Sequence, residues 1–423
     1  MSKKSSVEIG DFEFEIDDLE YLMKQKFNMK IMEKEEHAAL PAEIASDDSK
    51  YLTLKGKVNE TIEDEEHDVL LPEIIPEILL KLPADYLYKE LRLICKDWKS
   101  IISSKNFILE HFAGTKPVFL VQRKPRNLIS GCRRSYCMEI NEKQLDCKIQ
   151  EYEFNCLSQL KSSCYGILLI KSWKSSKLLQ VLNLMTRSCL TLPKCPSGCP
   201  HRNCGSALAF DPCTNRFKVV HMYADNFGFE IFTIGDSCNA WKRIPGPWKD
   251  LSQRPADLKL GWSDPVLING RFLYWNVCSF RYIVSMDVSD EKCIRVELPR
   301  TGQIFRPDSY HLLELGAQLS FMCASNRRID IWILQDFHTK LWFKKHTIDP
   351  RIIMTSSVNP LPSFRQLFPL AGTRNGVLVF KHTDDDKRIY IYDTERKRMQ
   401  KFITKIKVKR LIVHKSSLFK LQQ

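Results

Sequence analysis

Two hydrophobic patterns divide the chain near residue 115. Between Leu71 and Phe112, apolar residues recur three and four positions apart, as they do on one side of an α-helix. From Lys116 onward, short runs rich in β-branched and aromatic residues alternate with polar turns. The sequence therefore predicts an α+β multidomain protein, in which a short helical module precedes a larger all-β region.

The helical stretch carries two apolar stripes separated by Pro83 and Asp85. Proline cannot continue a helix and aspartate caps the next one, so we expect a break there. Pro76 also lies early in the first stripe, and we expect the first helix to begin near it. A segment of this length cannot bury both stripes within itself, so a partner is expected. The stripes consist of Ile74, Ile75, Ile78, Leu79 and Leu82, and then Leu91, Ile94, Trp98, Ile101 and Ile102.

The β-rich region repeats. Six segments each read as a strand, a polar turn and a second strand, and their equivalent starts are 43, 50, 53, 47 and 58 residues apart. Further apolar strand pairs lie between them, so each period of about fifty residues holds about four strands. That is the content of one propeller blade, and the sequence predicts a β-propeller of about six blades. The starts are Met138, Val181, Ile231, Val284, Ile331 and Ile389.

A propeller has to close its ring, because a single blade cannot bury both of its faces. The C-terminal stretch KFITKIKVKRLIVHKSSLFKL is basic and rich in β-branched residues. We expect it to supply a closing strand, with its lysines discouraging edge-to-edge association. The number of blades stays open between six and seven, since the spacings are irregular.

Residues 1–68 differ from the rest in charge. They hold nine lysines, no arginine and nineteen acidic residues, a net charge of −10 within a chain of +13, so residues 69–423 carry +23. The run EDEEHD repels itself, and we expect a largely disordered acidic tail. A short amphipathic helix over 12–32 is the exception. The basic residues of the body form no nucleic-acid reading motif, so we expect no nucleic-acid partner.

Composition excludes several classes of protein. There is no run of about twenty apolar residues and no secretory signal, so we expect no membrane association and a location in the nucleus or cytoplasm. The fifteen cysteines form an odd, scattered set. In a reducing compartment they are expected to be thiols and not a disulfide framework.

The helical stretch resembles the F-box of plant F-box proteins. The resemblance rests on Leu71-Pro72, Ile74, Ile78-Leu79, Leu82-Pro83 and the ending CK-x-W-x-x-I-I-S, and it covers residues 69–112. It implies a three-helix module that docks onto a Skp-type adaptor and, through it, onto a cullin scaffold. The implied adaptor-binding residues are Leu71, Pro72, Ile74, Ile78, Leu79, Leu82 and Pro83. Ile94, Cys95 and Trp98 are implied to pack the module's own helices.

The β-rich region, residues 116–423, resembles the F-box-associated, kelch-like repeat region of the same plant proteins, with the matches running from about Tyr165 to Trp275 and the later repeats matching more loosely. GILLI, VLNLMTRSCLTLP, ALAFDPCTNRFKVV, EIFTIGDSCNAWKRIPG and VLINGRFLYW carry this resemblance. In that family the region captures the protein to be ubiquitinated. Propellers bind ligands with loops between strands. Trp248 and Trp262 flank an irregular loop and are the predicted substrate contacts.

Cys195, Cys199, His201 and Cys204 are a possible metal-binding set, because three thiols and an imidazole suit zinc. Their spacing, C-x3-C-x-H-x2-C, matches no known finger or knuckle, and we interpret the segment as a cysteine-rich loop without metal. No cofactor is predicted.

Catalytic motifs such as G-x-S-x-G, a phosphate loop or H-E-x-x-H are missing from the sequence. We therefore expect a non-catalytic substrate-recognition subunit of a cullin-based ubiquitin ligase. Two alternatives remain. One is a propeller interaction module whose F-box does not dock productively, and the other is an enzyme that uses the propeller channel.

Overall fold

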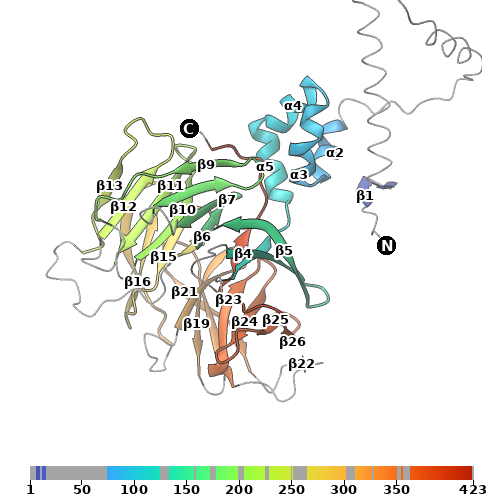
Figure 1. Cartoon of the computed structure of the whole chain (residues 1–423). Helices are drawn as coiled ribbons and strands as arrows, with labels where there is room; N and C mark the ends of the chain where they lie inside the picture. The colour runs from blue at the N-terminus through green and yellow to red at the C-terminus, as the bar shows by residue number, and fades with distance from the viewer. Residues whose placement is uncertain are drawn as a thin grey trace, which may run out of the picture. The chain divides into compact units, whose positions relative to one another are not determined.

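The computed structural model describes residues 6–9, 12–15, 74–123, 133–156, 159–171, 178–198, 204–223, 228–248, 250, 264–301, 310–325, 328–349, 354–355 and 363–421. The chain forms two compact units, Met1–Gly114 and Thr115–Gln423, and each is described by itself (Figure 1). Within the described residues, no helix is long and apolar enough to cross a membrane.

The first unit begins with a hairpin. Strand β1 (Ser6–Ile9) pairs antiparallel with β2 (Phe12–Glu15). The helix expected over residues 12–32 is therefore wrong at its start, because alternating apolar and acidic residues in FEFE have the period of a strand. Residues 16–73, which include most of the predicted acidic tail, lie outside the described residues.

The helical module contains more helices than the expected three. Four short α-helices and one 3-10 turn follow one another, and the contacts join α2 to α5, α4 to α5, and η1 to both α3 and α4. The elements are α2 (Ile75–Lys81), α3 (Ala84–Lys89), η1 (Leu91–Leu93), α4 (Lys96–Ser103) and α5 (Lys105–Gly114).

Prolines set where these helices start. Helix α2 begins with Pro76 in its first turn, as the sequence predicts, since a missing backbone N–H costs nothing there. Pro83 is the N-cap residue of α3, so the expected capping by Asp85 is wrong. Asp85 instead lies in the first turn, where its negative charge interacts favourably with the positive end of the helix dipole.

The second unit is a six-bladed propeller, as predicted (Figure 1). Each blade is a four-stranded antiparallel sheet, and a fifth, parallel strand, β22 (Met354–Thr355), joins the last one. Blade 1 contains β27 (Ile412–His414), β3 (Val118–Gln122), β4 (Arg133–Asn141) and β5 (Asp146–Cys156). Blade 2 contains β6 (Gln159–Cys164), β7 (Ile167–Lys171), β8 (Leu179–Asn183) and β9 (Ser188–Thr191). Blade 3 contains β10 (Cys204–Asp211), β11 (Arg216–Tyr223), β12 (Gly228–Thr233) and β13 (Trp241–Ile244).

Blades 4 to 6 follow the same order along the chain. Blade 4 contains β14 (Val266–Ile268), β15 (Phe272–Trp275), β16 (Tyr282–Asp287) and β17 (Lys292–Glu297). Blade 5 contains β18 (Tyr310–Leu315), β19 (Gln318–Ala324), β20 (Ile329–Leu334) and β21 (Trp342–Ile348). Blade 6 contains β23 (Leu367–Gly372), β24 (Val377–His382), β25 (Arg388–Asp393) and β26 (Arg398–Ile403), preceded by a 3-10 turn, η5 (Phe364–Gln366).

The six predicted repeat starts fall on equivalent positions. Each lies on the third strand of its blade, and each side chain is buried. The strand–turn–strand period in the sequence is therefore the hairpin that joins the third and fourth strands of every blade. These residues are Met138, Val181, Ile231, Val284, Ile331 and Ile389.

The hairpin turns share one geometry. An Asn or Asp at the end of a strand, or two residues after it in the case of Asp336, accepts a hydrogen bond from the backbone N–H two residues later, and the residue four positions later has a positive φ. The side chain thus satisfies a backbone donor that the turn would leave open. The turn begins at Asn141, Asn183, Asp211, Asp287, Asp336 and Asp393.

Apolar clusters fill every gap between neighbouring blades, including the gap between blades 6 and 1. The C-terminal strand β27 closes the ring by pairing antiparallel with β3, which confirms the predicted closing strand. Beyond β27, Asn183 donates through Nδ2 to the carbonyl oxygens of Ser417 and Phe419, at 3.0 and 2.6 Å. The end of the chain is therefore fastened to blade 2 as well as to blade 1.

Candidate functional site

The residues predicted to bind an adaptor lie mostly inside the helical module. Ile78, Leu79 and Leu82 are buried, with Leu79 fully shielded from solvent. Ile74 is half-buried and Pro83 is exposed, while Leu71 and Pro72 lie outside the described residues. The buried side chains hold the helices in position, and only their exposed neighbours can contact a partner directly.

The residues predicted to pack the module are less buried than that role implies. Ile94, Cys95 and Trp98 are all half-buried. Cys95 is the N-cap residue of α4, where its Sγ accepts a hydrogen bond from the Trp98 backbone N–H at 3.5 Å. Leu93 between α3 and α4 is 70% exposed. The module therefore presents apolar surface on its second half and buries much of the first stripe.

One histidine links the end of α2 to α5. The His111 ring is buried, and its Nε2 lies 2.8 Å from the carbonyl oxygen of Leu82. Burial lowers the pKa of His111 and outweighs the hydrogen bond to Leu82, which raises it. A neutral ring donating to that carbonyl satisfies an open group at the end of α2.

The structure does not place Trp248 on the surface as a substrate contact. Its indole is 8% exposed and packs in the apolar cluster between blades 3 and 4. Its Nε1 donates to the Tyr282 hydroxyl at 3.3 Å. The large apolar ring gains more from filling this interface than from facing water, which sequence position alone did not reveal. Trp262 lies outside the described residues.

Two of the four side chains in the predicted cysteine-rich set, Cys195 and Cys204, form hydrogen bonds with the ring of His221. The other two, Cys199 and His201, lie outside the described residues. Burial lowers the pKa of His221, yet hydrogen bonds to Cys195, Cys204 and Glu230 outweigh it and raise the pKa to about 10. Cys195, His221 and Glu230 place their ligand atoms within 4.8 Å of one another. The sequence had not indicated His221 and Glu230; the available signal was a histidine and a glutamate facing the same side of two apolar strands.

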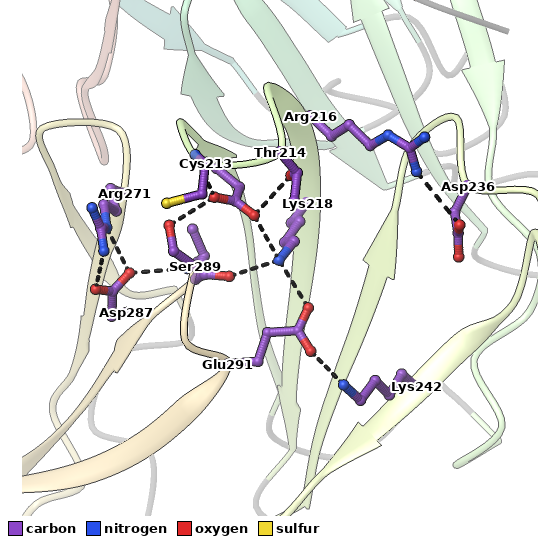
Figure 2. Close-up of polar contacts among 12 residues, drawn as sticks. Cys213, Thr214, Arg216, Lys218, Asp236, Lys242, Arg271, Asp287, Ser289 and Glu291 are labelled. Carbon is purple, nitrogen blue, oxygen red and sulfur yellow. Dashed lines mark hydrogen bonds and ion pairs between the residues drawn. The ribbon is translucent and has the colours of Figure 1, made fainter.

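A second polar cluster joins blade 3 to blade 4 (Figure 2). Lys218 extends from β11, and its Nζ lies 2.9 Å from Asp211 Oδ2 and 2.8 Å from Glu291 Oε1. It also donates to the carbonyl oxygen of Val288 at 2.9 Å. Ser289 completes the cluster by donating through Oγ to Asp211 Oδ1 at 2.7 Å.

The charges in this cluster stabilise one another. Burial raises the pKa of Asp211, but hydrogen bonds from Ser289, Lys218, Thr214 and the Cys213 backbone outweigh it, and the pKa lies well below its usual range. Burial lowers the pKa of Lys218 and is outweighed by the bonds to its two carboxylates, so that pKa is raised. Each group thus favours the charged state of its neighbours. The cluster therefore links blade 3 to blade 4 by buried ion pairs.

Most buried thiols are unsuited to nucleophilic chemistry. Burial raises the pKa of Cys137, Cys147 and Cys323 to about 11, with nearby carboxylates adding to the effect. Burial also raises the pKa of Cys164 and Cys293. These side chains are protonated at neutral pH, whereas a nucleophile needs a thiolate. No disulfide joins the cysteines in the described part of the chain.

Comparisons with known proteins agree with this division. Residues 118–420 match the F-box associated beta propeller domain, and residues 70–110 match the F-box domain. An F-box/LRR-repeat protein of Arabidopsis thaliana is 24% identical, over 76% of each chain. An F-box protein of the same plant is also 24% identical, over 79% of this chain and 91% of its own. A putative F-box/kelch-repeat protein is 26% identical over 70% and 83% of the two chains.

The propeller match alone spans well over half of the sequence, and the F-box match lies directly before it. The helices of the first unit and the six blades of the second correspond to these two matches. The chain therefore belongs to the family of plant-type F-box proteins that carry an F-box associated β-propeller domain.

Proposed function

We propose that the protein is a substrate receptor of a cullin-based ubiquitin ligase. The helical module would dock onto a Skp-type adaptor, and the propeller would hold the protein to be ubiquitinated. One observation carries the proposal: an F-box match at residues 70–110 stands directly before a propeller match at residues 118–420. This order joins a ligase-docking module to a binding domain in one chain.

The exposure of the helical module supports a docking role. Leu93 and Leu109 are exposed, and Ile94 and Trp98 are half-buried, in a module of about forty residues. A module this small cannot bury all of its apolar side chains within one core. An adaptor groove that accepts helices would remove this surface from water, at about 25 cal/mol for each Å² of apolar area.

The proposed role requires no chemistry from this chain. Holding a target near a charged ubiquitin carrier raises the effective concentration of the two reactants. The receptor would therefore be non-catalytic, and the specificity would come from the propeller. We also propose the nucleus or cytoplasm as its location.

Co-purification with a Skp-type adaptor tests the proposal. The full-length chain is expected to retain the adaptor through size-exclusion chromatography. Combined Leu71→Ala, Pro72→Ala and Pro83→Ala should weaken binding by about tenfold or more, equivalent to about 1.4 kcal/mol. The matched control replaces the exposed Lys81 and Lys99 of the same module with alanine and should bind as the wild type does.

A third variant separates contact from folding. Leu79→Ala should lose the adaptor because removing a fully buried leucine costs about 2–5 kcal/mol and unfolds the module. Circular dichroism should show a loss of helix in Leu79→Ala and no loss in the combined Leu71→Ala, Pro72→Ala and Pro83→Ala variant. If the wild type does not retain the adaptor, the ligase proposal fails and a propeller interaction protein with an unproductive F-box becomes the better account.

A further inference from the structure

A group of side chains of the types that bind metals lies between blades 2 and 3. Cys195 belongs to the connection that leaves β9, and Cys204 is the first residue of β10. His221 lies on β11 and Glu230 on β12. The two strand residues face blade 2, because Val219 and Phe232, each two positions away on its strand, belong to the apolar cluster that joins blades 2 and 3.

The separations suit a tetrahedral ion. His221 Nδ1 and Glu230 Oε2 are 3.5 Å apart, and the Cys195 thiol completes a group whose ligand atoms all lie within 4.8 Å. Bond lengths of about 2.0–2.1 Å to nitrogen and oxygen and about 2.3 Å to sulfur place tetrahedral ligands roughly 3.3–3.8 Å apart. The Cys204 thiol also hydrogen-bonds to the His221 ring, but it does not belong to the group of three whose ligand atoms lie within 4.8 Å of one another.

Glu230 provides an independent sign that a cation belongs here. Its side chain is fully buried, and Oε1 has no hydrogen-bond partner among the described residues. Arg243 Nε is 3.9 Å from that atom, which is too distant for a hydrogen bond. An uncompensated oxygen of a buried carboxylate costs several kcal/mol, and a metal ion would compensate it.

Ser197 occupies the position of a supporting group. Its Oγ donates to Glu230 Oε2 at 2.9 Å and lies 3.5 Å from Cys195 Sγ. Partners of this kind hold ligands in the orientation that a metal requires.

We propose that Cys195, His221 and Glu230 form a zinc site that ties blade 2 to blade 3. A thiol, an imidazole and a carboxylate favour zinc over magnesium or calcium, which take oxygen ligands almost exclusively. The ion would fix the connection that follows β9 to strands β11 and β12 of blade 3.

The opposite side of blade 3 shows what a metal-free cluster looks like. There, Lys218 supplies a buried ammonium to Asp211 and Glu291, and each carboxylate has hydrogen-bond partners (Figure 2). Between blades 2 and 3, the corresponding position holds soft ligands and one carboxylate oxygen without a hydrogen bond. The difference in ligand chemistry points to an ion on one side only.

Metal analysis of the purified full-length chain tests the proposal. After loading with zinc and extensive dialysis, we expect about one zinc ion per chain by inductively coupled plasma mass spectrometry. Cys195→Ser and Glu230→Gln should each lower the zinc content at least about tenfold. Cys189→Ser and Cys213→Ser, which replace exposed cysteines in the same two blades, should leave it unchanged.

A second readout keeps the test decisive if a variant folds poorly. Cobalt in place of zinc should give a sulfur-to-metal charge-transfer band and intense visible bands typical of tetrahedral coordination, in the wild type and in the Cys189→Ser control. The proposal is overturned if the zinc-loaded wild type retains less than about a tenth of an equivalent, or if the control variants lose zinc as the ligand variants do. The measurement involves no adaptor, so its result is independent of the proposed ligase role.

Discussion

The helical module and the propeller differ in how far each buries its own apolar side chains. The propeller closes on itself: apolar clusters fill all six gaps between blades, and β27 joins the two ends of the domain. The module has short helices and exposed leucines at positions 93 and 109. A closed ring can be stable alone, whereas a small open module gains most of its remaining stability from a partner.

We expect the largest loss of stability from removing the buried cation of the Lys218 cluster, which links blades 3 and 4. Lys218→Met leaves the carboxylates of Asp211 and Glu291 facing each other without their shared cation. Removing one partner of a buried ion cluster costs about 3–5 kcal/mol. Urea denaturation followed by tryptophan fluorescence should show a lower midpoint for the propeller transition, while the module's helix content stays unchanged.

The matched control is Lys242→Met. Lys242 also contacts Glu291, at 2.7 Å, but its side chain is 68% exposed. An exposed pair contributes about 0–1 kcal/mol, so the midpoint should barely move. If both variants shift the midpoint equally, burial of the Lys218 cluster does not govern propeller stability and the contrast between the two units weakens.

A smaller effect is expected from pH, and it follows from the same cluster. The pKa values of Asp211 and Glu291 are lower in the folded state, so their contribution is present above the unfolded values of about 4 and is lost as the pH falls further. The pKa of Lys218 is raised, so its contribution is present below about 10.4 and is lost as the pH rises through the folded value.

Stability measured between about pH 3 and pH 11 should therefore be highest in the interval between those limits. Lys218→Met should flatten the alkaline decline that Lys218 causes. A variant profile that follows the wild type at high pH would show that other groups set the alkaline limit.

How much the sequence could predict differs between the units for a physical reason. Strand periodicity and turn chemistry are local, so the repeat starts, including Met138 and Ile389, were placed on equivalent strands, and the closing strand was recognised from its composition. Helix starts also depend on local rules, and Pro76 was placed correctly. Capping by Asp85 failed because Pro83 took the cap position.

The parts that sequence missed depend on contacts between distant segments. Ile78 and Leu79 were assigned to a docking surface, yet they are buried. An apolar stripe in the sequence does not show whether a helix of the same module or a partner will cover it. Cys195 was grouped with its neighbours in sequence, whereas the structure pairs it with His221 and Glu230, more than twenty residues away. Trp248 was placed on the surface because a loop follows it, but the interface between blades 3 and 4 takes its ring.

Hydrogen–deuterium exchange of the full-length chain, with and without a Skp-type adaptor, tests the central claim most directly. The account predicts that amides in α2 to α5 exchange quickly in the isolated chain and are strongly protected by the adaptor, while the buried strands of the propeller exchange slowly in both samples. Unchanged exchange in the helices, or new protection confined to the propeller blades, would contradict the assignment of the helical module as the docking unit.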